Sequence, residues 1–356
     1  MEAYPMNGGN GPNSYANNSF LQRFFVDRSK SMIDEAIANY LDIQICPSSN
    51  TFRIADLGCS AGPNTFIAMQ IIVEAIDRKY RESEGLSGST PEFHVYFNDH
   101  ASNDFNTLFV TLPPEKPSLA AGVLGSFHTR LFPEGTLHVV HSLLSIQWLS
   151  QVPKEVLDID SPAYNKGRIH YANARHEVFA AYSAQYAKDI EAFLHARAEE
   201  VVCGGLVVLI VPAIPDESPP SQLHTQSMFD ILGSCLMDMA KTGIMEEAEV
   251  DSFNLPAYST RSRELKNLVE RNGCFNIERI VDILPQENKM RPSVQTLSDH
   301  FRAALEGVIK SHFGFEEHVL DHLFQHLYPQ KIEDTFASLT TYMEKTTTLF
   351  VVLRRN

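Results

Sequence analysis

An aspartate followed by a run of small residues lies near the start of the chain. Residues 52–66 read FRIADLGCSAGPNTF, so Asp56 ends an apolar run and a turn bounded by Gly58 and Gly62 follows it. One interpretation is a plain strand-to-helix turn, in which the glycines allow positive φ angles and Asn64 caps the next helix. The other is a ligand-binding turn, in which small side chains let backbone amides approach a bound group and the carboxylate binds its polar atoms.

Polar and aromatic residues also end the apolar runs that come next along the chain. Asn98 and Asp99 end EFHVYFND, Ser126 and Phe127 end LAAGVLGSF, and Trp148 comes just after TLHVVHSLLSI. Ligands of open α/β sheets bind at the carboxyl ends of the strands, so we expect these residues to lie close together. A carboxylate can accept hydrogen bonds from two ribose hydroxyls, and an aromatic ring can pack on adenine. The set therefore predicts a nucleoside site.

The spacing of the glycines argues against a dinucleotide. That fingerprint needs GxGxxG and an acidic residue about 20 residues later. Here only Gly58 and Gly62 follow the first strand, and Asp99 lies much farther along. A GxxxxGK(S/T) phosphate loop is also missing from the sequence. The pattern suits S-adenosylmethionine better, since that cofactor has no phosphate but carries a charged amino-acid tail.

Short apolar runs alternate with longer segments of helical periodicity, such as 20–41 and 65–82. Strands that alternate with helices and are buried on both faces indicate a doubly wound α/β sheet. The later segments are mostly helical in pattern, which indicates a cap inserted into the core. The strands are predicted at 52–58, 92–99, 119–127, 136–146, 204–212, 275–284 and 347–355.

The predicted organisation has four parts. The Gly-, Asn- and Ser-rich N-terminus is typical of a disordered tail, but Tyr15, Ser19 and Gln22 suggest that it folds over something. We therefore expect a closing segment at 1–30, an α/β core at 31–215, a mostly helical cap at 216–345 interrupted by a core strand near 275–284, and a last core strand at 346–356.

Composition limits the classes of function. The chain of 356 residues has a formal net charge of −15 and no clustered Lys and Arg, which argues against a nucleic-acid partner. Its five cysteines form no CxxC pair, which indicates a reducing compartment. The N-terminus has no signal-peptide pattern, and the longest apolar stretch, GGLVVLIVPAIP, is too short to span a membrane. We expect a cytoplasmic protein.

Several longer motifs occur in an order that identifies a family. They are MNGGNGPNSYANNSFLQR, IADLGCSAGPNT, YFNDHASNDFNTLF, AGVLGSFHTRLFP, HSLLSIQWLSQVP, AYNKGRIHY and VDSFNLPAYS. Together they resemble the plant SABATH methyltransferases, and the resemblance covers nearly the whole chain. Those enzymes use S-adenosylmethionine to methylate carboxyl groups of small acids or ring nitrogens of xanthines. The resemblance implies a Rossmann-like class I methyltransferase core with a mixed sheet, an inserted helical cap, and a homodimer.

The resemblance also implies roles for individual residues. Gln22 and Trp148 would hold the carboxylate of the acceptor, and Tyr15, Leu144, Gln147 and Tyr258 would line its pocket. A peripheral magnesium site would involve Asn165, Asp251, Phe253 and Asn254. The residues around S-adenosylmethionine would be Tyr15, Asp56, Cys59, Asn64, Asp99, His100, Ser126, Phe127 and Leu143.

These residue types agree with carboxyl methylation. A carboxylate with a pKa near ~4 is already ionised at neutral pH, so the chemistry needs positioning and water exclusion rather than a general base. The acceptor half departs from the family pattern, however, because Leu144 and Gln147 stand where many members have Tyr and His. Asn7, Leu124 and His128 are further departures. N-methylation of a xanthine-like ring, or a degenerate member that only binds the cofactor, are the alternatives.

Overall fold

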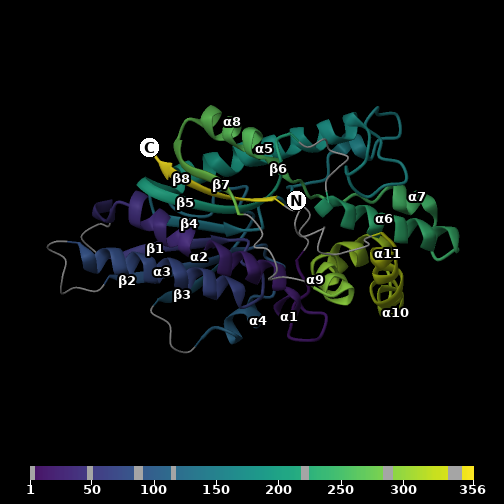
Figure 1. Cartoon of the computed structure of the whole chain (residues 1–356), viewed down its shortest axis with the longest axis horizontal. Helices are drawn as coiled ribbons and strands as arrows, with labels where there is room; N and C mark the ends of the chain where they lie inside the picture. Colours follow the sequence, from purple (N-terminus) through teal and green to yellow (C-terminus); the bar gives the residue numbers. More distant parts are fainter. Residues whose placement is uncertain are drawn as a thin grey trace.

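A mixed β-sheet forms the centre of the protein (Figure 1). The structure, a computed structural model, describes residues 5–45, 51–83, 91–113, 118–217, 224–283, 292–335 and 347–356. The strands are β1 (Thr51–Leu57), β2 (Glu92–Asp99), β3 (Leu119–Leu124), β4 (Leu137–Leu143), β5 (Val201–Ile214), β6 (Thr260–Arg261), β7 (Phe275–Asp282) and β8 (Thr347–Arg355).

The strand order explains where a ligand can bind. It runs β3-β2-β1-β4-β5-β8-β7, and the short β6, which the sequence did not predict, pairs with the end of β5. Strands β1 to β5 are parallel, whereas β8 is antiparallel to both β5 and β7. The order reverses at β1, whose neighbours are β2 and β4, so a crevice opens at the carboxyl ends of these three strands. The predicted α/β fold with a mixed sheet is confirmed.

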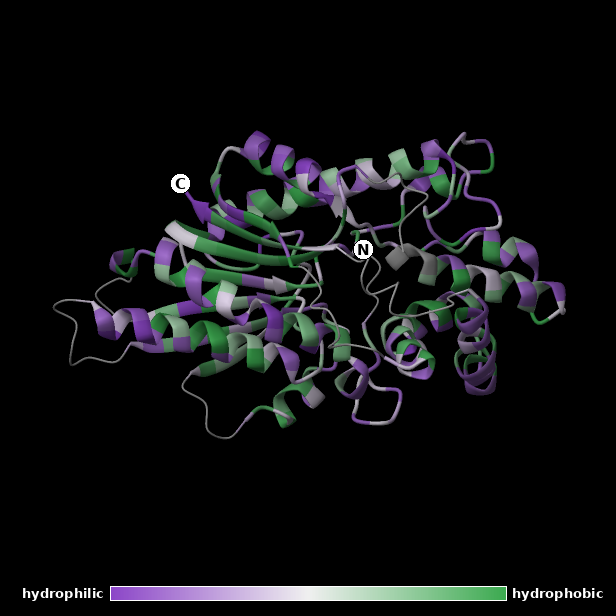
Figure 2. Ribbon diagram, in the orientation of Figure 1, coloured by the Kyte–Doolittle hydropathy of each residue, from purple (hydrophilic) through white to green (hydrophobic). Residues whose placement is uncertain are grey.

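Helices cover both faces of the sheet. Alternate residues of the central strands point to opposite faces, so Val139 packs with the helices α2 and α3, while Val140 packs with α5 and α8. Figure 2 shows the strands as mainly hydrophobic and the outer surfaces of these helices as hydrophilic. The helices are α1 (Tyr15–Asn18), α2 (Phe20–Tyr40), η1 (Ile43–Ile45), α3 (Asn64–Glu82), α4 (Phe105–Val110), η2 (Lys154–Val156), α5 (His176–Glu200), α6 (His224–Lys241), α7 (Glu247–Asp251), α8 (Ser262–Asn272), α9 (Val294–Phe313), α10 (Glu317–His322), η4 (Leu323–Leu327) and α11 (Tyr328–Thr335).

A second group of helices lies beyond the end of the sheet (Figure 1). It comprises α6, α7, α9, α10 and α11, which share a hydrophobic core of their own around Leu236, Phe301 and Phe324. Helix α8 comes from the same stretch of sequence but lies on the sheet, because Leu265, Leu268 and Val269 pack into the core beside α5. We propose that the second group is the inserted cap and that α8 belongs to the core.

A buried ion pair fixes the loop that follows β3. The side chains of Arg197 and Glu200 are fully buried, with 2.7 Å between Arg197 Nη2 and Glu200 Oε2. The guanidinium also donates to the backbone carbonyl of Phe127 (2.9 Å) and to that of Thr129 (3.0 Å). The Glu200 carboxylate accepts the backbone N–H of Phe132 at 3.0 Å. Because both charges hold the same loop, its shape depends on the pair.

We expect Glu200→Gln to destabilise the fold by about 3 kcal/mol, because it leaves Arg197 as a buried charge without its partner. The control is Asp27→Asn, which breaks the exposed Arg23–Asp27 pair and should cost less than about 1 kcal/mol. Urea unfolding of both variants measures the difference in unfolding free energy. Equal effects for the two substitutions would contradict the role given to the buried pair.

Candidate active site

The turn between β1 and α3 lies against the ends of β2 and β4. Gly58 has a φ of 80°, and a Cβ at this position would come within 2.3 Å of Ser145 Oγ, so only glycine fits. The backbone N–H groups of Gly58 and Cys59 donate to the carbonyl of Asn98 at 2.9 and 3.0 Å. The local sequence therefore forms a tight turn that leaves room beside it for a ligand.

Asp99 lies at the edge of a cavity beside this turn. Its Oδ2 accepts the backbone N–H of Ser60 (2.8 Å), and its Oδ1 accepts that of His100 (2.7 Å). Burial raises the pKa of the Asp99 carboxyl, while the two N–H donors act in the opposite direction. We call this space the Asp99 cavity; its volume is about 70 Å³, and its lining includes Tyr15, Gly58, Ser60, Asp99, His100, Phe127, His128, Ser145, Leu149 and Pro256.

The structure separates the predicted cofactor residues into two groups. Tyr15, Asp99, His100 and Phe127 line the Asp99 cavity. A contact with the cofactor stays a prediction for the remaining ones, which do not appear in its lining: Asp56, Cys59, Asn64, Ser126 and Leu143.

Asp56 has a structural role beneath the turn. Its Oδ1 lies 2.7 Å from Nδ1 of His141, and its Oδ2 accepts a hydrogen bond from the Thr65 hydroxyl. These contacts join the end of β1 to β4 and to the first turn of α3. Burial raises the pKa of the nearby Cys59 thiol, with Asp99 as the second cause, so Cys59 is a neutral packing residue rather than a nucleophile.

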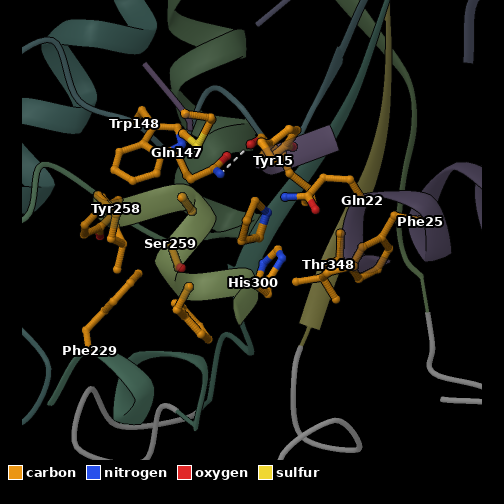
Figure 3. Close-up of a pocket in the computed structure, with 18 of the residues that line it drawn as sticks. Tyr15, Gln22, Phe25, Gln147, Trp148, Phe229, Tyr258, Ser259, His300 and Thr348 are labelled. Atoms are coloured by element: carbon orange, nitrogen blue, oxygen red, sulfur yellow. Dashed lines mark hydrogen bonds between the residues drawn. The ribbon is translucent and has the colours of Figure 1, made fainter. Parts of the chain in front are cut away.

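A second cavity meets the first. We call it the Gln22 cavity; it has a volume of about 140 Å³ and is shown in Figure 3. Of the residues predicted to bind the acceptor, all line it, namely Tyr15, Gln22, Leu144, Gln147, Trp148 and Tyr258. Both cavities are lined by Met6, Tyr15, Leu144 and Trp148. The two cavities therefore adjoin at this shared wall.

The polar groups of the Gln22 cavity differ in their availability. Gln22 Oε1 is buried without a partner among the described residues, so the amide Nε2 is the end that faces the cavity (Figure 3). Gln147 Nε2 already donates to the Leu144 carbonyl at 2.6 Å. The Tyr258 hydroxyl donates to Glu264 (3.0 Å), so Tyr258 contributes its ring to the wall. Gln22 and the Trp148 indole remain as side-chain N–H donors for a ligand, beside the hydroxyls of Tyr15, Ser259 and Thr348.

The segment before Gln22 closes this space from one side. The backbone N–H of Asn7 donates to the carbonyl of Ala303 on α9 at 2.9 Å. At its other end, Asn64 Nδ2 donates to the carbonyl of Ser19 at 3.0 Å. Residues 5–22 are thus held by both the core and α9.

The family is decided by comparison with known proteins. The model of the SAM-dependent carboxyl methyltransferase family matches residues 1–356. This chain belongs to that family. A loganic acid O-methyltransferase from Catharanthus roseus is 44% identical over 100% of this chain and 95% of that protein. A farnesoic acid carboxyl-O-methyltransferase from Arabidopsis thaliana is 40% identical and covers 88% of each chain. A solved structure of loganic acid methyltransferase with SAH superposes with a TM-score of 0.94, at 43% identity and 99% coverage of both chains.

Family membership confirms the predicted class of enzyme, an S-adenosylmethionine-dependent carboxyl methyltransferase. The Asp99 cavity of this methyltransferase fits such a cofactor, because a half-buried carboxylate, Asp99, and a buried aromatic ring, Phe127, line the same small space. Each Asp99 oxygen uses one lone pair on a backbone N–H and keeps another for a ribose hydroxyl. Among the described residues, no helix is both long and apolar enough to cross a membrane.

The magnesium site predicted for this methyltransferase is not supported. Asn165 Nδ2 donates to Asn254 Oδ1 at 2.7 Å, so the oxygen that would bind a cation already accepts from an amide. Asp251 Oδ1 accepts the backbone N–H of Gly167 at 2.6 Å. Phe253 can offer only its carbonyl. Within the described ranges, no three His, Cys, Asp or Glu side chains gather to hold a metal ion, whereas Mg²⁺ usually takes one or two carboxylates together with water or phosphate.

Sequence reasoning missed much of the wall of the Gln22 cavity. Met6 and Leu21 lie inside a recognised motif, and Phe24 and Phe25 follow it directly, so their neighbourhood was a usable signal. The residues of α9 belong to no recognised motif, and helical spacing indicates only that they face a core. The missed lining residues are Met6, Leu21, Phe24, Phe25, His170, Pro212, Phe229, Ala257, Ser259, Ile283, His300, Phe301, Ala304, Leu305 and Thr348.

His170 makes this methyltransferase sensitive to acid. Its Nε2 donates to the carbonyl of Ala257 (3.0 Å), its Nδ1 accepts the N–H of Ala172 (3.3 Å), and burial lowers its pKa to about 3. In the unfolded chain a histidine has a pKa of about 6.5, so below that pH protonation of His170 favours the unfolded state. The contribution of His170 to the unfolding free energy is therefore complete above ~6.5 and is lost as the pH falls from ~6.5 toward the folded pKa. At pH 5 the loss from His170 should be about 2 kcal/mol.

Urea unfolding at pH 7.5 and pH 5 measures this loss. We expect His170→Asn to reduce the difference in unfolding free energy between the two pH values by about 2 kcal/mol relative to the unsubstituted protein. The control His195→Asn changes an exposed histidine and should leave the difference unaltered. The same pH dependence in all three proteins would show that His170 is not the neutral buried group described above.

Proposed function

We propose that this methyltransferase esterifies a small carboxylic acid with a largely apolar body, and that transfer occurs across the wall shared by its two cavities. The supporting observation is that Met6, Tyr15, Leu144 and Trp148 line both spaces. In this proposal the Asp99 cavity holds S-adenosylmethionine and the Gln22 cavity holds the acid. Residues 5–22 exclude water from the junction.

The acceptor carboxylate is held by neutral donors. Gln22 and Trp148 line the cavity and each carries a side-chain N–H group, and among the described residues no Lys or Arg belongs to its lining. An ion pair would stabilise the negative charge and lower the reactivity of the oxygen, whereas these two donors orient the carboxylate and leave it nucleophilic. Burial, with Asp99 as the second cause, raises the pKa of Tyr15, so its phenol stays neutral beside the reacting groups.

The reaction needs no proton transfer. S-adenosylmethionine supplies a methyl group made electrophilic by the positive sulfur. One carboxylate oxygen forms a bond to the methyl carbon as the carbon–sulfur bond breaks, and the electron pair of that bond stays on sulfur. The products are the methyl ester and S-adenosylhomocysteine. The residues of the shared wall contribute alignment, which is worth several kcal/mol when the reacting atoms are held about 3–3.5 Å apart.

The shape of the Gln22 cavity favours acids with a bulky hydrocarbon body. Most of its wall is apolar, with Phe25, Phe229 and Phe301 among the larger side chains. The names of the two relatives above specify carboxylic acids, a loganic and a farnesoic acid. Leu144, in place of the family's usual tyrosine, adds to the apolar wall. A homodimer and a cytoplasmic location stay predictions of the sequence.

Methyl transfer from isotope-labelled S-adenosylmethionine tests the function. A panel of aromatic, terpenoid and fatty acids is incubated with the protein, with xanthines alongside. We expect labelled, base-labile methyl esters from one class of acid. Label in a xanthine and in none of the acids would contradict the carboxyl acceptor, and cofactor binding without any labelled product would favour a degenerate member.

Two substitutions test the acceptor side. We expect Trp148→Phe and Gln22→Leu each to raise KM for the acid about tenfold or more, because each removes a donor to a charged group. The Kd for S-adenosylhomocysteine should change less than about threefold, since in this proposal neither side chain forms a hydrogen bond with the cofactor. Calorimetry gives the Kd and initial rates give KM. A loss of cofactor affinity as large as the rise in KM would contradict the assignment of these two donors to the acceptor carboxylate.

Asp99→Asn should show the reverse pattern. The amide cannot accept from ribose hydroxyls on both sides, so we expect the Kd for S-adenosylhomocysteine to rise about tenfold or more. KM for the acid at saturating cofactor should stay nearly constant. An unchanged Kd in a folded variant would contradict the ribose assignment.

A further inference from the structure

His300 on α9 joins the N-terminal segment to the Gln22 cavity. Its Nδ1 lies 2.8 Å from the backbone carbonyl of Asn18. A carbonyl oxygen can only accept, so Nδ1 carries the ring proton and Nε2 carries the free lone pair. The hydrogen bond to Asn18 therefore selects one tautomer of the imidazole.

The other ring nitrogen is available to a ligand. His300 lines the Gln22 cavity, its side chain is only 5% exposed, and its Nε2 has no hydrogen bond to any described residue. The rings of Phe20 and Phe301 pack around it, with ring centroids at 5.1 and 5.5 Å. Burial lowers its pKa, so the ring is neutral. His300 thus offers a buried hydrogen-bond acceptor without a charge.

His300 and Trp148 lie on different sides of the Gln22 cavity. In Figure 3 His300 lies between Ser259 and Thr348, and Gln147 and Trp148 lie on the other side of the cavity. An acid whose carboxylate reaches Trp148 would therefore direct its remote end toward His300.

We propose that His300 accepts a hydrogen bond from a hydroxyl group of the acceptor, so that the preferred substrate is a hydroxylated monocarboxylic acid. This inference rests on the proposed function for the orientation of the acid. An acceptor without the hydroxyl leaves Nε2 buried and unpaired, and sites of this kind discriminate strongly against such analogues. A second carboxylate at this end would be repelled, because its oxygens would face the lone pair of His300 Nε2.

Matched probes measure the preference. They are the ortho-, meta- and para-hydroxyphenylpropanoic acids, unsubstituted phenylpropanoic acid, and the methoxy analogue of whichever hydroxylated isomer binds best. Affinity for the complex with S-adenosylhomocysteine is followed by the fluorescence of Trp148, the only tryptophan in the chain. We expect the best hydroxylated isomer to bind about tenfold or more tightly than the other two kinds of acid.

Two variants separate the roles of the two ring nitrogens. In His300→Asn the amide NH₂ replaces Nδ1–H and can keep the bond to Asn18, whereas Nε2 is lost, so the preference for the hydroxylated acid should fall about tenfold. The affinity for the unsubstituted acid should stay the same. In His300→Gln the amide oxygen lies near the place of Nε2, and most of the preference should return.

A failure of this inference can be told apart from a failure of the proposed function. No preference in the unsubstituted protein, or an unchanged preference in folded His300→Asn, would overturn the role of His300, even if esters form. Conversely, a preference that depends on His300, in a protein that makes no ester from any acid, would support this inference and contradict the proposed function.

Discussion

The two cavities depend on the placement of residues 5–22 between the core and α9. The backbone N–H of Gly9 donates to Asp104 (2.8 Å) on the core side, and His300 Nδ1 lies 2.8 Å from the Asn18 carbonyl on the other. This placement brings Met6, Tyr15 and Gln22 to the ligand. It also replaces water at the junction with fixed protein groups, which favours a displacement between a carboxylate and a positively charged sulfur.

The core supplies rigidity beneath this junction through buried charged groups. Asp56 is paired with His141 and Thr65 below the β1 turn, and the buried Arg197–Glu200 pair holds the loop that carries Phe127. Two carboxylates that sequence patterns associate with function thus make different contacts. Asp99 lines a cavity, whereas Asp56 joins three elements of the fold.

The sequence predicts the parts of this site that a local pattern encodes. Gly58 and Asp99 mark strand ends, and Gln22 and Trp148 lie in long motifs, so the sheet, the turn and much of the acceptor wall follow from them. His300 lies in no motif and reaches the cavity only because α9 folds back over the N-terminus. The same limit applies to α8, whose helical pattern did not reveal that it packs on α5, and to Asn165, whose side-chain N–H donates to Asn254.

A crystal structure with S-adenosylhomocysteine and the best acid from the panel tests methyl transfer between the two cavities most directly. We expect the sulfur in the Asp99 cavity, the carboxylate hydrogen-bonded to Gln22 and Trp148, and one carboxylate oxygen facing the sulfur past Tyr15 and Leu144. A carboxylate bound at the His300 end of the cavity, or a sulfur that faces away from the shared wall, would contradict transfer between the two cavities.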